Sequence, residues 1–523
     1  MRIGIDVGGT NTDAVLMDGR TVLAEFKTPT TPEVTGGIVA ALDGLQAGRP
    51  FPPADVTAVM IGTTHFTNAV VEAERLSRTA TVRLGLPATA GLPPMTDWPA
   101  QLRRALGEHV YLCHGGYEFD GRLISDFDES EVRAAAADIA AKGIQSVAVS
   151  SVFSPVNPEM ELRAADVLRE VIPGLAVSVS HEIGRVGLLE RENATILNAC
   201  LRELAEHITA ALEKSVRGAG IEAPVYISQN DGTLMSVDYC RQYPVATFAS
   251  GPTNSMRGAA FLSGRSDCVV VDVGGTTSDV GALVHGFPRE AAVAVDIGGV
   301  RTNFRMPDVL SVGLGGGSLV ARAEEAVTVG PRSVGYAIRD RALVFGGDTV
   351  TATDLVVAAG MCVVGDPARV ADLDADLVRA GVRHMQERLA ELVDRVKTSA
   401  DPLPVVVVGG GSILLEDHLE GASEILKPDH FAVANAIGAA IAQVGAEVDK
   451  VFSLAELPRE QALDSARQEA VAKATAAGAQ ASTVQIVDVE EVPLAYLPSN
   501  AVRIRVKAVG DLPLGGEDVA AGT

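Results

Sequence analysis

The sequence is poor in aromatic residues and in cysteine. Phe, Trp and Tyr make up 4% of the 523 residues, and there is a single Trp, so the cores must be built from Ala, Val, Leu and Ile. The five cysteines are scattered and include no CxxC pair. An odd number of separated cysteines predicts reduced, mostly buried thiols in a cytosolic protein rather than a disulfide framework.

Basic residues and long apolar runs are also scarce. The chain has 43 Lys and Arg against 67 Asp and Glu, a net charge of −24. This balance argues against a surface for nucleic acid or for anionic membranes, because both need basic patches. No apolar run reaches the roughly 18 residues of a membrane span. Met1 is followed directly by an expected strand, which leaves no room for a signal peptide, so we expect a cytoplasmic protein.

One octapeptide occurs twice, about half the chain apart. The copies are Asp-Val-Gly-Gly-Thr-Asn-Thr-Asp at 6–13 and Asp-Val-Gly-Gly-Thr-Thr-Ser-Asp at 272–279. Each stands between two short apolar runs, which predicts strand, tight turn, strand. Adjacent glycines carry no Cβ and tolerate φ > 0, so backbone N–H groups can approach an anion. A single such turn is more often a plain hairpin, but two copies predict two like domains holding one nucleotide.

The residues expected to hold phosphate lie in these two turns. They are Gly8, Gly9, Thr10, Asn11, Thr12, Gly274, Gly275, Thr276 and Thr277.

Two further glycine turns and one small-residue helix accompany the repeat. Gly62-Thr63-Thr64 follows a strand at 56–61 and begins a helix, which indicates either an anion seat or plain N-capping. The run Gly409-Gly410-Gly411 follows the all-valine strand 405–408, where bare backbone could carry a flat ligand. The alanine- and glycine-rich helix expected at 434–446 would allow a close helix crossing.

A dense polar run, 180–199, begins a long helix expected to reach residue 217 and to link the two halves. Glu190 and Asn193 share one helix face. Two interpretations remain open for them, a solvated polar face and a substrate wall at the domain junction.

The expected fold class is α/β, with three units. The first domain is 1–190 and contains an alternating α/β insertion: helix 128–142, strand 146–153, helix 157–171 and strand 175–179. The second domain, 191–452, includes a strand at 291–297, helices at 352–360 and 366–398, and the crossing helix. A small α/β segment, 453–523, completes the chain.

The order of these features resembles the actin, Hsp70 and sugar-kinase superfamily, in which a nucleotide lies between two duplicated domains with ribonuclease H-like folds. More narrowly, the chain resembles the A-type, ATP-binding subunit of the hydantoinase/oxoprolinase family over nearly its whole length. The resemblance rests on the two octapeptides, Gly-Thr-Thr with Thr-Asn-Ala at 62–69, Ser-Gly-Pro at 250–252, Gly-Gly-Gly-Ser at 315–318 and the turn at 409–412.

The sequence departs from the family where substrate would bind. Many members carry Phe in place of Asn11, and the stretches 181–198 and 250–255 differ from the family pattern. The identity of the substrate therefore does not transfer with the resemblance.

The resemblance implies ATP-dependent ring opening of a cyclic amide or imide such as a hydantoin or 5-oxoproline, with ATP and Mg²⁺ as cofactors. Phosphorylation of the carbonyl oxygen would make the poor lactam electrophile reactive. A B-type partner subunit would complete hydrolysis, and a homo- or hetero-oligomer is expected. Asp6 and Asp272 would hold Mg²⁺, largely through water.

The resemblance also implies roles for other residues. Asp13 and Asp279 would act as bases or support the metal site, with turn stabilisation as the alternative, and the 409–411 turn would carry adenine and ribose. The substrate candidates are Thr63, Thr64, Asn68, Glu190 and Asn193.

Two other functions fit the same motifs. A small-molecule or sugar kinase would act alone and release a stable phosphate ester. An ATP-gated clamp would show slow ATP hydrolysis and no small substrate, although 453–523 shows no peptide-binding β domain.

Overall fold

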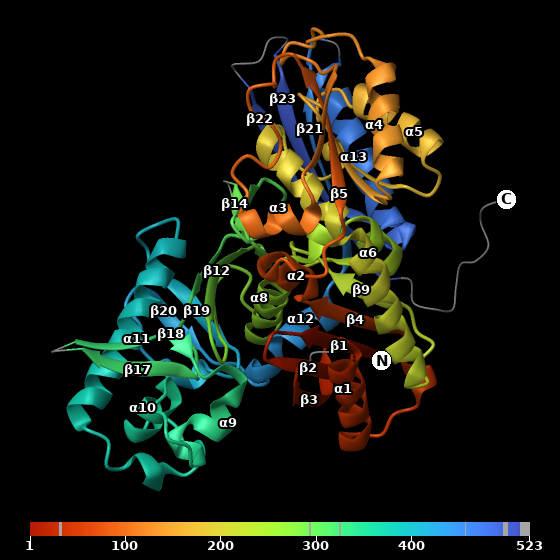
Figure 1. The fold of residues 1–523 in the computed structure, drawn as a ribbon. Coiled ribbons are helices and arrows are strands. Elements are labelled where there is room, and N and C mark those ends of the chain that lie inside the picture. Colours follow the sequence, from red (N-terminus) through yellow and green to blue (C-terminus); the bar gives the residue numbers. More distant parts are fainter. Residues whose placement is uncertain (31–33, 292–293, 324–325, 456, 495–499, 513–523) are drawn as a thin grey trace.

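The computed structural model of the chain describes all residues except 31–33, 292–293, 324–325, 456, 495–499 and 513–523. Two sheets form its centre, and each contains one copy of the repeated octapeptide (Figure 1). Among the described helices, none combines the length and apolar character needed to cross a bilayer.

The larger sheet has nine strands in the order β22-β23-β21-β10-β9-β4-β1-β2-β3. Its first hairpin pairs β1 with β2 antiparallel, with Asp6 opposite Asp13, and β4 lies parallel to β1. Both β1 and β4 are buried along nearly their whole length, as their Ile- and Val-rich sequences predict. The bounds are β1 Arg2–Val7, β2 Asn11–Asp18, β3 Thr21–Pro29, β4 Ala58–Thr63, β9 Val225–Ser228, β10 Leu234–Ser236, β21 Val444–Phe452, β22 Gln485–Pro493 and β23 Val502–Gly510.

The second sheet repeats this arrangement. In it β11 pairs antiparallel with β12, with Asp272 opposite Asp279, and β19 lies parallel to β11. The repeat in the sequence is thus a repeat in three dimensions. The bounds are β11 Cys268–Val273, β12 Ser278–Val284, β13 Phe287–Pro288, β16 Val309–Val312, β19 Leu403–Val408 and β20 Ala422–Leu426.

Two helices cross between the sheets. Helix α8, Ser250–Ser263, packs on the second sheet, and α12, Ala434–Ile441, packs on β1, β2 and β4 of the first. They touch where Gly258 and Gly438 lie against the backbone of the other helix. This crossing joins the two halves of the molecule, and its glycine and alanine content explains how the axes can approach so closely.

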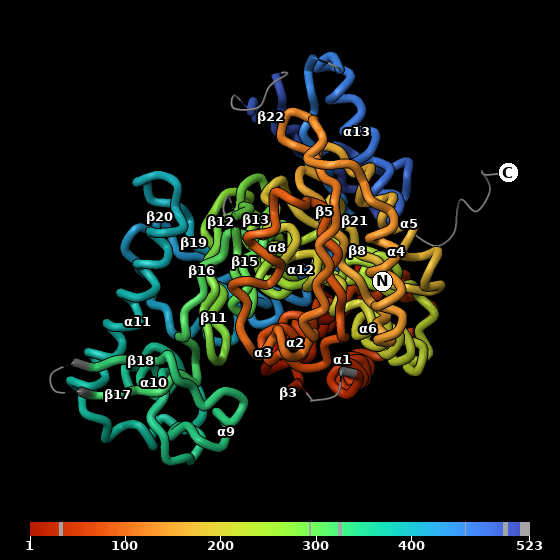
Figure 2. Tube along the Cα trace, turned by 45° about the horizontal axis from the view of Figure 1, so that its top comes forward, coloured from red at the N-terminus to blue at the C-terminus, as the bar shows by residue number. Residues whose placement is uncertain are grey.

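A four-stranded parallel sheet, β6-β5-β7-β8, forms the insertion of the first half. Figure 2 shows it beside α4 and α5, with the C-terminal elements β22 and α13 above it. Its bounds are β5 Thr79–Leu86, β6 His109–His114, β7 Ser146–Ser151, β8 Ala176–Val179, α3 Ala100–Leu106, α4 Glu129–Ala141 and α5 Glu159–Val171. The expected alternation over 128–179 is confirmed.

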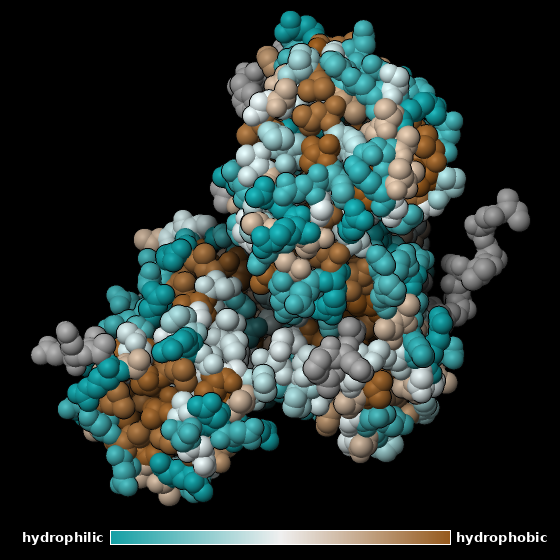
Figure 3. Space-filling view, viewed as in Figure 1, coloured by the Kyte–Doolittle hydropathy of each residue, from teal (hydrophilic) through white to brown (hydrophobic). Residues whose placement is uncertain are grey.

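The remaining elements surround these sheets. Helix α11 covers the second sheet, and Figure 3 shows a hollow between the lobe carrying α9, α10 and α11 and the rest of the molecule. Their bounds are α1 Val34–Gly48, α2 His65–Glu72, α6 Leu188–Gly218, α7 Val237–Gln242, β14 Val295–Ile297, β15 Val300–Thr302, β17 Ser318–Ala323, β18 Ala326–Ser333, α9 Ile338–Arg341, α10 Ala352–Ala358, α11 Ala375–Val396 and α13 Arg459–Ala476.

Several predicted boundaries were wrong. The helix expected at 434–446 ends at Ile441, and β21 follows it, because alternating side chains of Val444, Ala446 and Val448 enter the core. The helix expected at 366–398 begins only at Ala375. The strand expected at 291–297 covers 295–297, and 292–293 lie outside the described residues.

The C-terminal region continues the first sheet. Strand β23 pairs with β21 along nine residues, and β22 pairs with β23. The small α/β segment expected after residue 453 therefore extends the nine-stranded sheet. The three domain boundaries remain predictions.

Candidate functional site

Both octapeptide turns and the glycine turn at 409–411 line one cavity of about 580 Å³, called here the hairpin cavity. Residues that are 266 positions apart in the repeat thus face a common space. The predicted site residues in its wall are Gly8, Gly9, Thr10, Asn11, Asp13, Thr64, Asn68, Asp272, Gly274, Gly275, Thr276, Thr277, Asp279, Gly409, Gly410 and Gly411.

Five predicted residues do not line the hairpin cavity. Asp6 and Thr12 are buried directly behind the first turn. Thr63 is buried, and its hydroxyl lies 2.5 Å from Nδ1 of His65. Glu190 and Asn193 lie elsewhere: Glu190 pairs with Arg301 at 3.3 Å, and Asn193 accepts a hydrogen bond from Trp98 at 2.8 Å.

The two turns are closed by the same hydrogen bond. Gly8 N donates to Asn11 O at 3.0 Å, and Gly274 N donates to Thr277 O at 2.8 Å. A neighbouring loop supports the second turn, because Gly316 N donates to Gly274 O at 3.0 Å. These hydrogen bonds hold the turns in place on the side away from the cavity. The remaining N–H groups of the turns are available to an anion.

Each leading aspartate lies over a glycine at the end of the neighbouring parallel strand. A Cβ atom on Gly62 would lie 2.2 Å from Oδ1 of Asp6, and a Cβ on Gly409 would lie 2.2 Å from Oδ1 of Asp272. Neither position could carry a side chain without displacing the carboxylate. Gly62, near the end of β4, and Gly409, directly after β19, are therefore part of the repeated carboxylate site, a role that the sequence alone did not reveal.

Amide side chains from the crossing helices hold the first carboxylates. Asn254 of α8 donates to Oδ1 of Asp6 at 3.1 Å. Asn435 of α12 donates to Oδ2 of Asp6 at 3.0 Å and to Oδ2 of Asp13 at 2.8 Å. Lys27 pairs with the other oxygen of Asp13 at 2.8 Å.

The carboxylates of the two hairpins influence one another electrostatically. Burial raises the pKa of Asp6 to about 6, and the negative charges of Asp13 and Asp272 add to the rise against the hydrogen bonds from the two asparagines. Burial likewise raises the pKa of Asp272, and it raises that of Asp279 to about 6 with a contribution from Asp272. The cavity thus carries negative charge that nearby cations do not balance.

This donor set fits a hydrated divalent cation. In the described residues no three His, Cys, Asp or Glu side chains converge as direct metal ligands. Oxygen ligands and several retained waters are what Mg²⁺ prefers, and an added cation would stabilise the ionised carboxylates, which burial and, to a smaller degree, their mutual repulsion disfavour.

Sequence reasoning missed five polar side chains around the hairpin cavity: Lys27, Ser255, Arg339, Thr353 and Asn435. A signal existed for Asn435, the single polar residue of α12. The pairing of Lys27 with Asp13 had no signal, because it depends on the register of β2 and β3.

Comparison with known protein families agrees with this arrangement. Residues 2–172 match the hydantoinase/oxoprolinase N-terminal region, and residues 191–364 match the hydantoinase/oxoprolinase model that follows it. The chain belongs to the hydantoinase/oxoprolinase family. Two thirds of its length is covered by the two models together.

Similar curated proteins include subunits of two kinds of enzyme. The caprolactamase subunit alpha of Pseudomonas jessenii is 28% identical over 392 residues, which cover 69% of this chain and 54% of that protein. The acetophenone carboxylase gamma subunit of Aromatoleum aromaticum is 28% identical over 398 residues, covering 68% and 53%. The chain therefore spans about half the length of these relatives.

A solved structure shows the same fold. The ATP-dependent caprolactamase from Pseudomonas jessenii superimposes with a TM-score of 0.80 at 20% identity, covering 100% of this chain and 89% of that chain. The predicted α/β fold class is confirmed, and the two sheets repeat one hairpin arrangement on either side of a common cavity.

Proposed function

We propose that this chain is the ATP-binding subunit of an enzyme that opens a cyclic amide or imide, such as a hydantoin or 5-oxoproline, at the expense of ATP. One observation carries the proposal: both copies of the glycine turn and the 409–411 turn line a single cavity. Its volume of about 580 Å³ is in the range of small-molecule sites.

ATP would supply a phosphoryl group to the carbonyl oxygen, which turns an unreactive amide into an activated one. The chain's contribution is to position the reactants and stabilise charge, which dominates phosphoryl transfer. The turns at 8–11 and 274–277 would provide N–H groups and hydroxyls for the phosphates, and the buried Thr12 would support the first turn. Gly409, Gly410 and Gly411 offer bare backbone for the adenosine part.

The carboxylates have a different task. Asp6 and Asp272 would hold Mg²⁺ through water, and Asp13 and Asp279 would orient those waters or accept a proton. Lys27 and Arg339 are the cations of the wall, and they are placed to neutralise charge that develops during transfer. Thr64 and Asn68 lie on the same wall and remain the candidates for substrate contact in this cavity.

A B-type partner would complete the reaction. Several relatives are named as subunits of larger enzymes, which supports a multi-subunit assembly. The test is release of ADP, phosphate and ring-opened product from hydantoin, 5-oxoproline and simple lactams, with and without a B-type subunit. A stable sugar phosphate formed by the chain alone would overturn the proposal in favour of a kinase.

A second candidate is ATP-dependent carboxylation of a small ketone. The relatives named acetophenone carboxylase gamma subunit and acetone carboxylase beta subunit favour it. Phosphorylation of the carbonyl oxygen would activate a ketone as it would a cyclic amide, so the hairpin cavity would serve either reaction. Bicarbonate-dependent ATP turnover with acetone or acetophenone, absent with cyclic amides, would decide for carboxylation.

A further inference from the structure

A second cavity, of about 180 Å³, lies at the start of α6 and is called here the His181 cavity. It shares no lining residue with the hairpin cavity among the described residues. Its wall combines four separate parts of the chain, 181–185, 229–231, 303–305 and 446–450, with Tyr239 and Tyr243. The volume is below the roughly 300–1,000 Å³ of drug-sized pockets, so it suits a ligand of few atoms.

A buried carboxylate fixes the histidine of this wall. Glu161 has no exposed surface, and its Oε2 lies 2.7 Å from Nδ1 of His181 and accepts the backbone N–H of the same residue at 3.1 Å. Its other oxygen accepts hydrogen bonds from Ser151 N and from the hydroxyl of Ser180. Burying a carboxylate is costly unless hydrogen bonds satisfy it, and here four donors do so.

A fully buried arginine holds this arrangement from behind. Arg191 donates from Nε to Ser180 Oγ at 2.8 Å and from Nη2 to Ser151 O at 2.6 Å, and its Nη1 reaches the carbonyl oxygens of Arg185 and Val186. Burial alone would raise the pKa of Glu161, but the hydrogen bond from His181 and the charge of Arg191 lower it below its ordinary value. Glu161 therefore stays ionised. Ser180 and Arg191, the two buried residues of the segment 180–191, thus help to position His181.

The contact between Glu161 and Nδ1 of His181 determines the state of the other ring nitrogen, Nε2. A carboxylate that accepts the Nδ1–H of a histidine selects the tautomer whose Nε2 carries a lone pair. Nε2 of His181 has no hydrogen-bond partner among the described residues, and it is not one of the buried unsatisfied atoms. The ring lines the cavity, so Nε2 is an accessible acceptor for a ligand.

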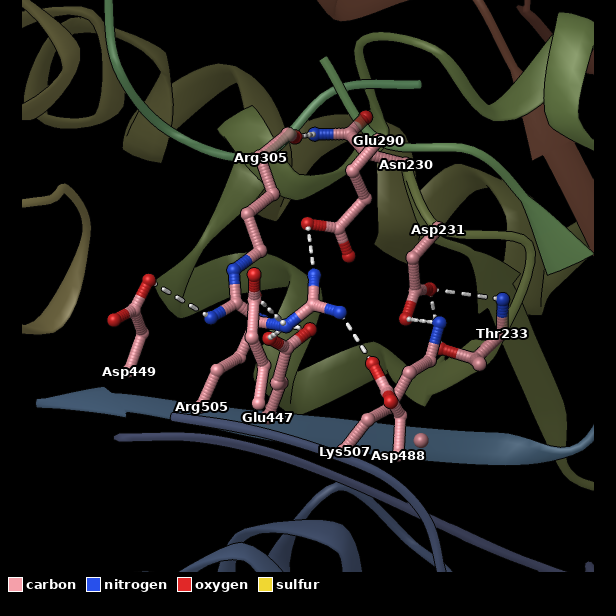
Figure 4. Close-up of polar contacts among 12 residues, drawn as sticks. Asn230, Asp231, Thr233, Glu290, Arg305, Glu447, Asp449, Asp488, Arg505 and Lys507 are labelled. Carbon is pink, nitrogen blue, oxygen red and sulfur yellow. Dashed lines mark hydrogen bonds and ion pairs between the residues drawn. The ribbon is translucent and has the colours of Figure 1, made fainter. Parts of the chain in front are cut away.

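The rest of the wall offers aromatic faces and several charged side chains. Among the described residues Glu182, which accepts a hydrogen bond from the hydroxyl of Tyr243 at 2.7 Å, has no ion-pair partner. The rings of Tyr239 and Tyr243 lie 4.7 Å apart, and Phe304 joins them in the lining. Figure 4 shows the ion pairs of this wall, where Arg305 reaches Glu447 and Asp449. Arg505, which is not among the lining residues, lies between Glu290 and Asp488. Because Arg305, Glu447 and Asp449 are paired with one another, this part of the wall favours a neutral ligand over an ion.

The His181 cavity is one helix away from the first hairpin. Asn230 accepts a hydrogen bond from Ala249 N at 2.8 Å, and the hydroxyl of Thr253 donates to Gln229 O at 3.2 Å. The next residue of α8, Asn254, donates to Asp6. The start of α8 therefore contacts both sites.

We propose that the His181 cavity binds a small neutral cyclic amide or imide, whose N–H donates to Nε2 of His181 and whose ring lies against Tyr239 and Tyr243. The choice of ligand class rests on the function proposed above. The site itself rests on the cavity, the aromatic faces and the buried positioning of the histidine.

The test uses the full chain without nucleotide and follows histidine ring signals by ¹⁵N NMR while hydantoin is added. We expect a saturable shift of the His181 signal with hydantoin and none with 1,3-dimethylhydantoin, which has the same ring but no N–H. A shift of equal size with both compounds would overturn the proposal.

Two substitutions separate binding from folding. His181→Asn places an amide N–H where Nδ1 was, so it keeps the Glu161 contact but removes Nε2. We expect unchanged thermal stability and at least tenfold weaker hydantoin binding. Glu161→Gln, at a positioning residue, should move the His181 ring signals toward a mixture of tautomers before any ligand is added. Full hydantoin affinity in His181→Asn would refute the assignment.

The proposal for the His181 cavity and the proposed function can be tested separately. Asp272→Asn should still bind hydantoin at His181 although its ATP turnover is lost. If hydantoin stimulates ATP turnover while the His181 signal does not move, the present inference fails and the proposed function stands.

Discussion

Asn435 bridges the two aspartates of the first hairpin: its Nδ2 lies 3.0 Å from Asp6 and 2.8 Å from Asp13. The amide comes from the crossing helix α12, more than 400 residues further along the chain. Two carboxylates on paired strands would repel each other, and one shared donor offsets part of this repulsion. The first hairpin and the helix crossing are thereby one structural unit.

Asn435→Ala removes this donor and leaves two buried acceptors with one partner fewer. Because an unsatisfied buried acceptor costs about 1–3 kcal/mol, we expect the free energy of unfolding to fall by that amount. The measurement is denaturant unfolding at pH 7. In an Asp13→Asn background the same substitution should cost clearly less, and equal costs in both backgrounds would show that the bridge contributes nothing.

Asp272→Asn should abolish ATP turnover without unfolding the chain. The side chain is partly exposed to the hairpin cavity, and the amide has nearly the same shape as the carboxylate but cannot hold a cation's water in the same way. Turnover is measured as ADP release, and folding as the melting temperature. Near-normal turnover would remove Asp272 from the mechanism.

The raised pKa of Asp6 gives stability a definite pH dependence. Its value of about 6 in the folded chain lies above the ordinary 3.8, so the folded state prefers the protonated form. The stabilising contribution is fully present below about pH 4 and is lost as the pH rises through 6. Relative to Asp6→Asn, the free energy of unfolding of the wild type should fall by about 2 kcal/mol from pH 4 to 7.

Denaturant unfolding of both proteins across this pH range checks the sign as well as the size. Added Mg²⁺ should reduce the difference at pH 7, because a cation in the hairpin cavity stabilises the ionised carboxylates. A difference that grows as the pH rises would contradict the assignment.

The hairpins could be predicted because their determinants are local. Apolar runs define β1, β2, β11 and β12, and adjacent glycines define the turns, so the repeat predicted both the strands and the shared cavity. The valine run of β19 was equally clear.

What the sequence did not show depends on contacts between distant segments. Glu190 and Asn193 share a helix face as expected, but Arg301 and Trp98, far away in the sequence, contact that face. The expected helix 434–446 includes the first three residues of β21, because their alanine and glycine content continues that of α12; pairing with β10 and β23 makes them part of a strand. The Glu161–His181 contact joins α5 to the segment before α6, and no spacing rule indicates it.

The helix crossing leads to the last prediction, on Gly258 and Gly438. A Cβ on Gly438 would lie 1.8 Å from Asn254 O, and a Cβ on Gly258 would lie 1.9 Å from Ala434 O. Alanine is favoured over glycine in a helix by about 1 kcal/mol, yet we expect Gly438→Ala to destabilise the chain by about 1–3 kcal/mol or more, because the helices must separate.

The same separation would move Asn254 and Asn435 away from Asp6, so Gly438→Ala should weaken nucleotide binding as well as lower the melting temperature. Gly218→Ala, at the end of α6, is the matched control, because its added Cβ meets no atom within 4 Å. It should leave both properties unchanged or raise stability slightly. If Gly438→Ala behaved like this control, the close crossing would not be what couples the two sheets to the first carboxylate pair.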